Sequence, residues 1–378
     1  MLTLGVEEEF FVVDRDDGTL AEDALPGLEL LQGQVPPSYG EVAGFEREFQ
    51  LSIVETRTGV CANLDEMRDQ LEWLRCALID AAAASNQMIV AAGTLPSVDW
   101  RVARLTDKPR YAEIADHYRD VAQRRATCGC HVHVGIVDRD QAVRALNRVR
   151  PWLPVLLALS ASSPFYDAAD TGYESFRSLL WGAFPVAGPP EIHDSYEQYA
   201  EKIRLLVATG AILDAGHVYW DARLGTRHET LEFRIADACT TVDEAVLQVA
   251  LCRALALTCM REDEGGVPLP TVPSELLRAA TWRAGRSGLG GTLVDVLARE
   301  SVPALLLVER LLAYVREALE DLGDLDEVVE LLHEIQMGGT SARRQRDALP
   351  GDGRLAGVAG RVAAETDPTW RLPGRIRS

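Results

Sequence analysis

Residues 219–236 read YWDARLGTRHETLEFRIA, and apolar and polar side chains alternate at both ends of this stretch. Alternation with a period of two is typical of a half-buried β-strand. We predict two strands, over residues 217–223 and 229–236, which a short loop joins as a hairpin. In the second strand the apolar side chains face the core: Leu231, Phe233 and Ile235.

The polar side chains of this hairpin point away from the core. They are Asp221 and Arg223 on the first strand, and Thr230, Glu232 and Arg234 on the second. Two antiparallel strands thus present acid and base on one face. Taken alone, the pattern fits a cross-strand ladder of ion pairs as well as it fits a binding face.

Three acids interrupt an apolar strand near the N-terminus, where residues 5–10 read GVEEEF. Side chains alternate along a strand, so Glu7 and Glu9 share one face, whereas Glu8 has the parity of its apolar neighbours. Two carboxylates side by side repel each other unless a cation lies between them. The pattern therefore indicates either a solvated strand end or a cation site.

A strand predicted over residues 45–55 carries two further acids, Glu48 and Glu55. Polar and apolar residues alternate from Glu48 to Ile53, as expected for a strand with one buried face. Glu55 has the apolar parity, so we expect it to lie past the end of the strand or after a bulge. Each acid is either a surface residue or part of a site.

Residues 129–135 read GCHVHVG and predict a further strand, on which His131 and His133 share one face. Two histidines in this spacing suit a metal or phosphate site, and a purely structural pair is the alternative. Acids, histidines and arginines thus recur on single faces of several predicted strands. Such a face suits hard divalent cations and anionic substrates.

Helices are predicted between these strands. Asn63 with Glu66, and Thr241 with Glu244, have the spacing of capping boxes at the starts of two helices. Strands that are joined both by hairpins and by helices predict an α+β fold with an antiparallel sheet. Because the chain has neither an internal repeat nor a low-complexity linker, we expect residues 1–378 to form a single domain.

The composition disfavours several classes of protein. A formal net charge of −20 makes nucleic acid and anionic membranes poor partners. The two lysines, Lys108 and Lys202, lie outside any P-loop motif, so bound ATP would need arginines, backbone amides and metal. The seven cysteines suggest neither a disulfide framework nor a zinc motif. The sequence shows neither a transmembrane run nor a secretory signal, so we expect a cytoplasmic protein.

The ordered motifs of the chain resemble the carboxylate–amine ligases of the glutamate–cysteine ligase type 2 group. The matching segments are GVEEEF at 5–10, VETRTGVC at 54–61, GCHVHVG at 129–135, SPFYDAADTGYESFRS at 163–178, YWDAR at 219–223, TLEFR at 230–234 and SARRQRDA at 341–348. The resemblance implies a glutamine-synthetase-like fold, a curved antiparallel sheet flanked by helices. It also implies ATP and Mg²⁺, and a possible homodimer.

The implied reaction phosphorylates a substrate carboxylate, often the γ-carboxylate of glutamate, and the amine of cysteine or another compound then attacks the acyl phosphate. The implied metal ligands are Glu7, Glu9, Glu48, Glu55, His131 and Glu232. Glu232 and Arg234 would be catalytic, since Arg234 can stabilise charge on the transferred phosphoryl group. The acid substrate would bind Arg177 and Arg223, and the nucleotide would lie near His133, Gln345 and Arg346.

Three other hypotheses compete with this one. The same fold could join a different acid and amine, because the metal and ATP residues would be shared. A zinc hydrolase could use His131, His133 and a carboxylate, although Arg177 and Arg234 would then have no role. A non-catalytic binding protein would be expected to have lost some of these acids and arginines. No hypothesis needs a cysteine nucleophile, so we expect Cys130 to pack behind the sheet.

Overall fold

The computed structural model describes residues 2–96, 103–124, 126–349 and 355–370. A seven-stranded antiparallel sheet forms its centre, in the order β2-β3-β1-β5-β9-β8, with β4 paired to β1 as well. The strands are β1 (Leu4–Asp14), β2 (Gly44–Arg47), β3 (Ile53–Arg57), β4 (Gln87–Val90), β5 (Cys130–Gly135), β8 (Ala222–Leu224) and β9 (Thr230–Phe233). This mixture of helices and an antiparallel sheet confirms the predicted fold class.

The first strand organises the sheet because it is long enough to pair with three others. Residues 4–8 of β1 pair with β5, residues 7–11 with β3, and residues 11–14 with β4. The β8–β9 hairpin is also present, and β9 pairs with β5 on its other edge. The GVEEEF, GCHVHVG and TLEFR motifs therefore lie on three adjacent strands.

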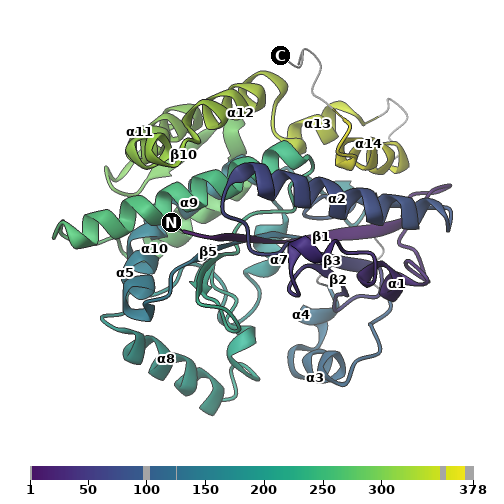
Figure 1. Ribbon diagram of the computed structural model, residues 1–378, viewed down its shortest axis with the longest axis horizontal. Coiled ribbons are helices and arrows are strands. Elements are labelled where there is room, and N and C mark those ends of the chain that lie inside the picture. Colours follow the sequence, from purple (N-terminus) through teal and green to yellow (C-terminus); the bar gives the residue numbers. More distant parts are fainter. Residues whose placement is uncertain (1, 97–102, 125, 350–354, 371–378) are drawn as a thin grey trace.

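Long helices cover the apolar face of this sheet. In Figure 1, α2, α9, α11 and α12 lie above the sheet, and α9 contacts α2, α5, α11 and α12. Their bounds are α2 (Leu64–Ala83), α5 (Arg139–Val149), α6 (Leu153–Ser160), α9 (Val242–Glu264), α11 (Ala304–Leu322) and α12 (Leu325–Gly338). The main core joins them to apolar strand residues, among them Val6, Val132, Leu231 and Phe233.

Among the remaining elements, α3, α4 and α8 lie on the opposite side of the sheet in Figure 1. The helices are α1 (Leu28–Gln32), α3 (Pro109–Tyr118), α4 (Asp120–Gln123), α7 (Arg177–Trp181), α8 (Tyr196–Ala208), α10 (Ser274–Ser287), α13 (Ser341–Asp347) and α14 (Ala356–Thr366). Two small hairpins complete the strands: β6 (Phe165–Tyr166) with β7 (Ala169–Asp170), and β10 (Thr292–Asp295) with β11 (Glu300–Pro303). Short 3₁₀ turns span Pro37–Tyr39, Arg150–Trp152, Ala215–His217 and Gly288–Gly290.

Both predicted helix starts are confirmed. The Asn63 side chain accepts a hydrogen bond from the Glu66 amide at the start of α2. Thr241 and Glu244 form a reciprocal capping box at the start of α9. These contacts satisfy backbone N–H groups that a helix start otherwise leaves without partners.

The strand predicted over residues 45–55 is wrong, because the chain reverses there and forms the β2–β3 hairpin. The turn closes through hydrogen bonds from the Glu48 amide to the Ile53 carbonyl (3.0 Å) and from the Ile53 amide to the Gln50 carbonyl (2.9 Å). Residues 48–52 contain none of the Gly, Pro, Asn or Asp residues that usually mark a turn. The parity argument for Glu55 fails for the same reason, and Glu55 lies inside β3.

Glu8 points into the helical side of the sheet, where it meets Arg75 of α2. Both side chains are buried, and the guanidinium contacts the carboxylate twice, at 2.6 and 3.1 Å. The other Arg75 donors reach the backbone carbonyls of Cys239, Thr240 and Thr366. A buried acid on the apolar parity is thus compensated by an arginine from a distant part of the chain.

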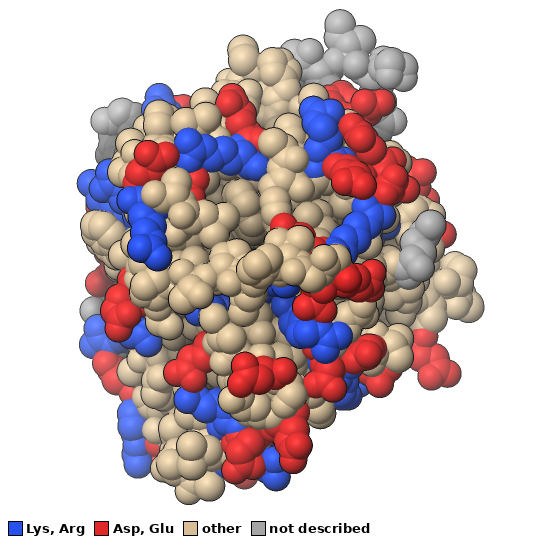
Figure 2. Space-filling model, turned by 90° about the vertical axis from the view of Figure 1, so that its left-hand side faces the viewer, with Lys and Arg blue, Asp and Glu red and all other residues tan. Residues whose placement is uncertain are grey.

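On the face drawn in Figure 2, acidic and basic side chains are interspersed among uncharged ones. Within the described ranges, none of the helices combines the length and the apolar character that crossing a bilayer requires.

Candidate active site

The polar face of the sheet brings the predicted acids and histidines into register. Glu9 lies opposite Glu55 across the β1–β3 ladder, and Glu7 lies opposite His131 across the β1–β5 ladder. His133 lies opposite Glu232 on β9. Residues that face each other across antiparallel strands have Cβ atoms about 4.5–5.5 Å apart. Motifs from four strands therefore form one continuous polar surface.

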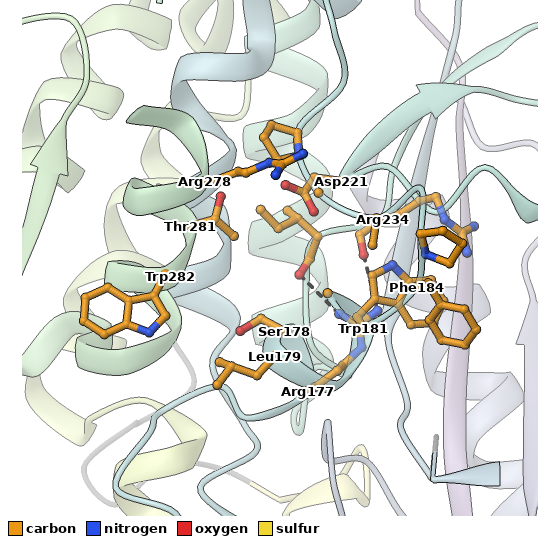
Figure 3. A pocket seen from close by; sticks show the side chains of 16 residues that line it. Arg177, Ser178, Leu179, Trp181, Phe184, Asp221, Arg234, Arg278, Thr281 and Trp282 are labelled. Atoms are coloured by element: carbon orange, nitrogen blue, oxygen red, sulfur yellow. Dashed lines mark hydrogen bonds between the residues drawn. The ribbon is translucent and has the colours of Figure 1, made fainter. Parts of the chain in front are cut away.

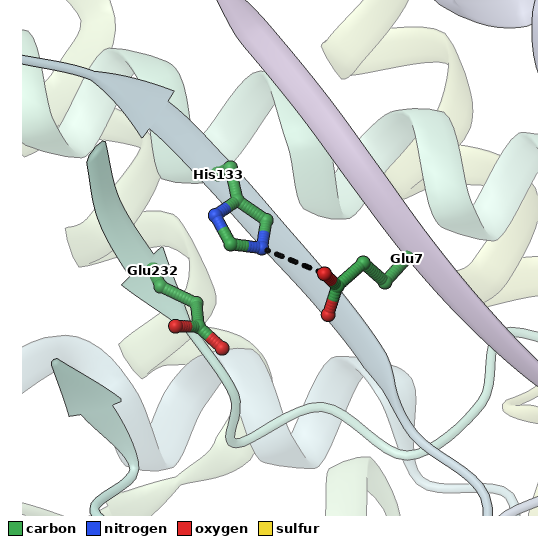
Figure 4. Close-up of side chains that lie close together, drawn as sticks. All are labelled: Glu7, His133 and Glu232. Atoms are coloured by element: carbon green, nitrogen blue, oxygen red, sulfur yellow. Dashed lines mark ion pairs between the residues drawn. The ribbon is translucent and has the colours of Figure 1, made fainter. Parts of the chain in front are cut away.

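One group of potential metal ligands consists of Glu7, His133 and Glu232, and one ligand atom from each lies within 4.8 Å of the others (Figure 4). His133 Nε2 lies 3.6 Å from a Glu7 carboxylate oxygen and has no hydrogen-bond partner. Its Nδ1 is 3.0 Å from the Thr230 hydroxyl, which holds the ring in this orientation. A ring nitrogen held in this way is typical of the outer shell of a metal site.

A second group consists of Glu9, Glu48 and Glu55, again within 4.8 Å of one another. Burial, together with the charges of Glu7, Glu48 and Glu9, raises the pKa of Glu55 well above its ordinary value. The Gly129 amide donates to Glu9 (2.6 Å) and the Phe49 amide donates to Glu48 (3.0 Å), so both carboxylates are oriented. Three crowded carboxylates need a cation to be ionised together, and oxygen ligands suit Mg²⁺ or Ca²⁺. Both groups therefore fit divalent cations.

His131 lies beside the first group and is not one of its three members. Its Nδ1 is 3.2 Å from Glu7, and because a carboxylate can only accept, Nδ1 carries the proton. Burial and the nearby Arg234 charge lower the pKa of His131 to about 3, so the ring stays neutral. Its Nε2 lone pair is buried without a partner, which leaves it available to a cation.

Two arginines hold Glu232. Arg223 donates to both of its oxygens, at 2.8 and 3.2 Å, and Arg234 contacts one of them. Burial alone would raise the pKa of Glu232, but the two guanidinium charges outweigh it and hold this pKa well below its ordinary value. The remaining bonds of Arg223 run to the carbonyls of Gly216 and Val218. Arg223, predicted to bind substrate, thus contacts Glu232 and backbone in this structure.

A cavity of about 360 Å³ adjoins this face, between α7, the segment 182–189, α10 and the end of β9 (Figure 3). Its lining includes Arg177, Trp181, Asp221, Arg234 and Trp282. The Arg177 guanidinium donates to the carbonyls of residues 234 and 235, each at 3.3 Å. Both arginines also lie over the Trp181 ring, at 5.3 and 5.7 Å from its centroid. Arg234 therefore belongs both to the cavity and to the surroundings of Glu232.

Of the three residues predicted near the nucleotide, His133 lies with Glu7 and Glu232, and the other two lie on α13. Gln345 donates to the Ser162 carbonyl at 2.7 Å, and Arg346 pairs with Asp170 at 2.9 Å and with Glu174. Within the described part of the chain, neither side chain bonds to an acid of the two metal-ligand groups. The structure thus brings the acids, histidines and two of the arginines together, while α13 packs against residues 162–174.

Two buried acids near the cavity were not assigned to the site from the sequence. Asp237 accepts hydrogen bonds from the Ser162 amide and from the hydroxyls of Ser163 and Ser175, and lies 3.8 Å from Arg177. Asp221 lines the cavity and has no such partners. In the sequence, each of these acids stands beside apolar strand residues, which could have indicated a buried acid. The same pattern also fits a ladder of surface ion pairs, so it did not distinguish the two cases.

Solved structures confirm the fold. The chain superposes with a TM-score of 0.72 on a glutamate–cysteine ligase from Francisella tularensis in complex with AMP, at 12% identity, covering 99% of this chain and 90% of the other. A bifunctional glutathione synthetase from Pasteurella multocida gives a TM-score of 0.70 at 17% identity and 97% coverage of this chain. The chain spans about half the length of that synthetase, 52%.

Sequence relatives identify the family. The chain is 38% identical to a Rhodopirellula baltica protein named for glutamate–cysteine ligase 2. The alignment spans 369 residues and covers 97% of each protein. A Saccharopolyspora erythraea relative named for glutamate–cysteine ligase 2-1 is 40% identical over 376 residues, 99% of this chain and 98% of the relative. The family model described as glutamate-cysteine ligase family 2 (GCS2) matches residues 3–364. The chain therefore belongs to glutamate-cysteine ligase family 2, and it is an enzyme of the ligase class.

Proposed function

We propose that this enzyme is an ATP-dependent carboxylate–amine ligase that joins the γ-carboxylate of glutamate to the amine of cysteine or of another compound. The observation that carries the proposal is the acidic sheet face, where two groups of metal-ligating side chains adjoin Arg234 and the cavity. The names of the relatives support glutamate and cysteine as substrates. A neighbour of similar fold binds AMP, which supports ATP as the phosphoryl donor.

The residues of the two groups would hold Mg²⁺. Glu9, Glu48 and Glu55 would bind one ion, and Glu7, His133 and Glu232 a second, with the Nε2 lone pair of His131 close by. When bound, Mg²⁺ neutralises phosphate charge in phosphoryl transfer. This also removes the repulsion among the carboxylates that raises the pKa of Glu55.

The reaction would proceed in two steps. A carboxylate oxygen of the acid substrate attacks the γ-phosphorus of ATP, and the bond to the bridging oxygen of ADP breaks. The amine nitrogen then attacks the acyl carbon, phosphate leaves, and the nitrogen loses a proton. Neither step requires a covalent bond to the protein, so positioning and charge stabilisation supply the catalysis.

Arg234 is placed to stabilise the charge that develops in the first step. One of its Nη atoms is held by Glu232, while its Nε–H is buried and has no acceptor among the described residues. This N–H group can donate to an anionic oxygen with little reorganisation of the site. Arg223 would act through Glu232, whose carboxylate it holds in place.

The other site residues keep their proposed roles. Arg177 would bind the acid substrate from the wall of the cavity, where its guanidinium donates to two backbone carbonyls and lies 3.8 Å from Asp237. Gln345 and Arg346 would contribute to nucleotide binding from α13. The nucleotide-binding roles of Gln345 and Arg346 rest on the resemblance to the family alone, because neither side chain contacts the described acids of the sheet face.

The decisive test measures ADP release from Mg²⁺-ATP with glutamate and a panel of amines that includes cysteine. Amine-dependent release with a γ-glutamyl product detected by mass spectrometry is the expected result, and EDTA should abolish it. ADP release that occurs only with acids other than glutamate would support the two-step ligase mechanism and refute glutamate as the acid substrate. Absence of release under all conditions, together with tightly bound zinc, would favour a zinc hydrolase.

A further inference from the structure

Asp221 is a buried acid that has no hydrogen-bond or ion-pair partner among the residues that the structure describes. It precedes β8, lines the cavity, and exposes 7% of its surface. Its Oδ2 atom is fully buried and accepts no hydrogen bond from the described residues. Within this part of the chain its carboxylate also forms no ion pair shorter than 4.0 Å. The side chain therefore lacks the compensation that buried acids normally have.

Two other buried acids nearby show what compensation looks like in this protein. Glu232 is held by two guanidinium groups, and Asp237 receives one amide and two hydroxyl donors. Asp221 has neither kind of contact, and burial raises its pKa to about 7 against the opposing charge of Arg177. Keeping such a carboxyl in a cavity is unfavourable for folding unless a ligand supplies the missing donor.

The backbone directs Asp221 toward the substrate side of the sheet. The Arg234 amide donates to the Asp221 carbonyl (2.8 Å), which continues the β8–β9 ladder by one step. Asp221 is two residues before Arg223, so the two side chains share the face that carries Glu232. Figure 3 shows Asp221 near Arg278 and Thr281 at one end of the cavity, with Arg177 and Ser178 toward the other.

The cavity thus presents an acid and cations that are not paired with one another. A ligand that carries both an ammonium group and a carboxylate would satisfy each with the opposite charge. A volume of about 360 Å³ is at the small end of ligand sites, which suits one amino acid better than a nucleotide. The apolar lining from Trp181, Phe184 and Trp282 would keep water from competing with these contacts.

The chemistry of the reaction decides which substrate this ligand is. An ammonium group bound to a carboxylate retains its proton, and a protonated nitrogen has no lone pair with which to attack an acyl phosphate. The amino group held by Asp221 is therefore one that does not react. In the ligase reaction such a group belongs to the acid substrate.

We propose that Asp221 is the receptor for the ammonium group of the acid substrate, so that this cavity selects an α-amino acid over the corresponding plain carboxylic acid. The proposal rests on the ligase function proposed above. It assigns to Asp221 a role in specificity, whereas Arg234 and the metal ligands serve the transfer of the phosphoryl group.

The test compares L-glutamate with glutarate, which lacks only the amino group, in the wild type and in Asp221→Asn. The wild type should prefer glutamate in kcat/KM for ADP release. Asp221→Asn should lower kcat/KM for glutamate roughly 10- to 100-fold, the usual effect of losing a buried charged contact, with little change for glutarate. Asp116→Asn, the same acid-to-amide change at an exposed residue of α3 outside the cavity lining, is the matched control and should keep the wild-type preference.

Several results would overturn the inference. Equal losses for glutamate and glutarate in Asp221→Asn would mean that Asp221 does not contact the amino group. A lower kcat with an unchanged KM for glutamate, and a dependence on the pKa of the attacking amine, would instead identify Asp221 as its general base. A comparable loss of the glutamate preference in Asp116→Asn would mean that the effect is not specific to the Asp221 carboxylate.

Calorimetric titration without ATP separates this inference from the proposed function. If the wild type binds glutamate no better than glutarate, the inference fails, whatever the turnover assay shows. If glutamate binding depends on Asp221 but no acid and amine give ADP release, the ligase proposal fails and the role of Asp221 stands. Thermal melting of both variants checks that each is folded.

Discussion

The pairing of Glu8 with Arg75 gives a prediction whose size follows from burial and contacts. Arg75→Met would remove the two contacts to the Glu8 carboxylate and the bonds to the carbonyls of Cys239, Thr240 and Thr366. Both partners are almost fully buried, at 0% and 2% exposure. The variant would leave the Glu8 carboxyl group in the core between β1 and α2 without its guanidinium partner and without water to replace it.

Breaking a buried ion pair from one side costs about 3–5 kcal/mol, because an uncompensated charge remains. We expect Arg75→Met to fall near the upper end of about 3–5 kcal/mol, since three carbonyls also lose a donor. Glu8→Gln should cost about 3 kcal/mol, because those carbonyls still hold the guanidinium. The double variant should recover about 2 kcal/mol relative to the sum of the single losses.

Urea unfolding followed by circular dichroism would measure these free energies of unfolding, with m-values compared to confirm a common unfolded state. Arg68→Met on the same helix is the control, because Arg68 makes partly exposed ion pairs to Asp243 and Glu327 and should cost about 1 kcal/mol or less. Additive single losses, with a coupling below about 0.5 kcal/mol, would refute the reasoning. So would equal losses in Arg75→Met and Arg68→Met.

Four further predictions concern the site and its supports. Asp221→Asn should raise the free energy of unfolding above pH 7 by about 4 kcal/mol, because a rise in the Asp221 pKa from 3.8 to about 7 destabilises the ionised form by that amount. Urea unfolding at several pH values should show this gain disappear below pH 4, and a gain that does not depend on pH would contradict the prediction. Glu55→Gln should raise the melting temperature in EDTA and reduce the stabilisation by Mg²⁺, whereas an unchanged Mg²⁺ response would argue against the cation site. Gly129→Ala would place a Cβ 2.3 Å from Arg177 Nη2, so the KM for the acid substrate should rise about tenfold or more, with calorimetry as the check. Cys130→Val should cost less than about 1.5 kcal/mol and leave ADP release unchanged, because Cys130 packs in the core; lost activity would reveal a chemical role.

Most of the sheet could be predicted because its strands carry a strong local signal. Residues 130–135 and 230–233 alternate apolar and polar side chains, and Val132, Leu231 and Phe233 join the helices in the main core as expected. In β1 the alternation is interrupted by Glu8 and is lost in the apolar run 10–13, which contributes to other core clusters. The β2–β3 turn escaped prediction because alternation continues through residues 48–52, which contain no Gly, Pro, Asn or Asp. Periodicity reports which face a side chain takes, and it does not report a reversal of the chain.

The candidate site was predictable in composition and only partly in arrangement. The acids of both metal-ligand groups were among the residues predicted to bind metal. The histidine of the first group is His133, which was predicted near the nucleotide, whereas His131, the predicted ligand, lies beside that group. The sequence alone could not say which imidazole nitrogen would lie near Glu7 and Glu232, because that depends on register and on the bond to Thr230. Glu8 was recognised as unusual, and its partner lies 67 residues away on a helix.

The sequence by itself determined which residues share a face, where α2 and α9 begin, and that acids and arginines gather on one side of the sheet. These properties follow from the fixed periods of strands and helices and from local capping, so they need no knowledge of distant residues. Only the tertiary structure decided that Arg75 compensates Glu8, that two arginines hold Glu232, and that Asp221 is left without a partner among the described residues. A buried charge takes its partner from whichever segment packs against it, and that depends on strand register and helix packing, which are properties of the whole fold.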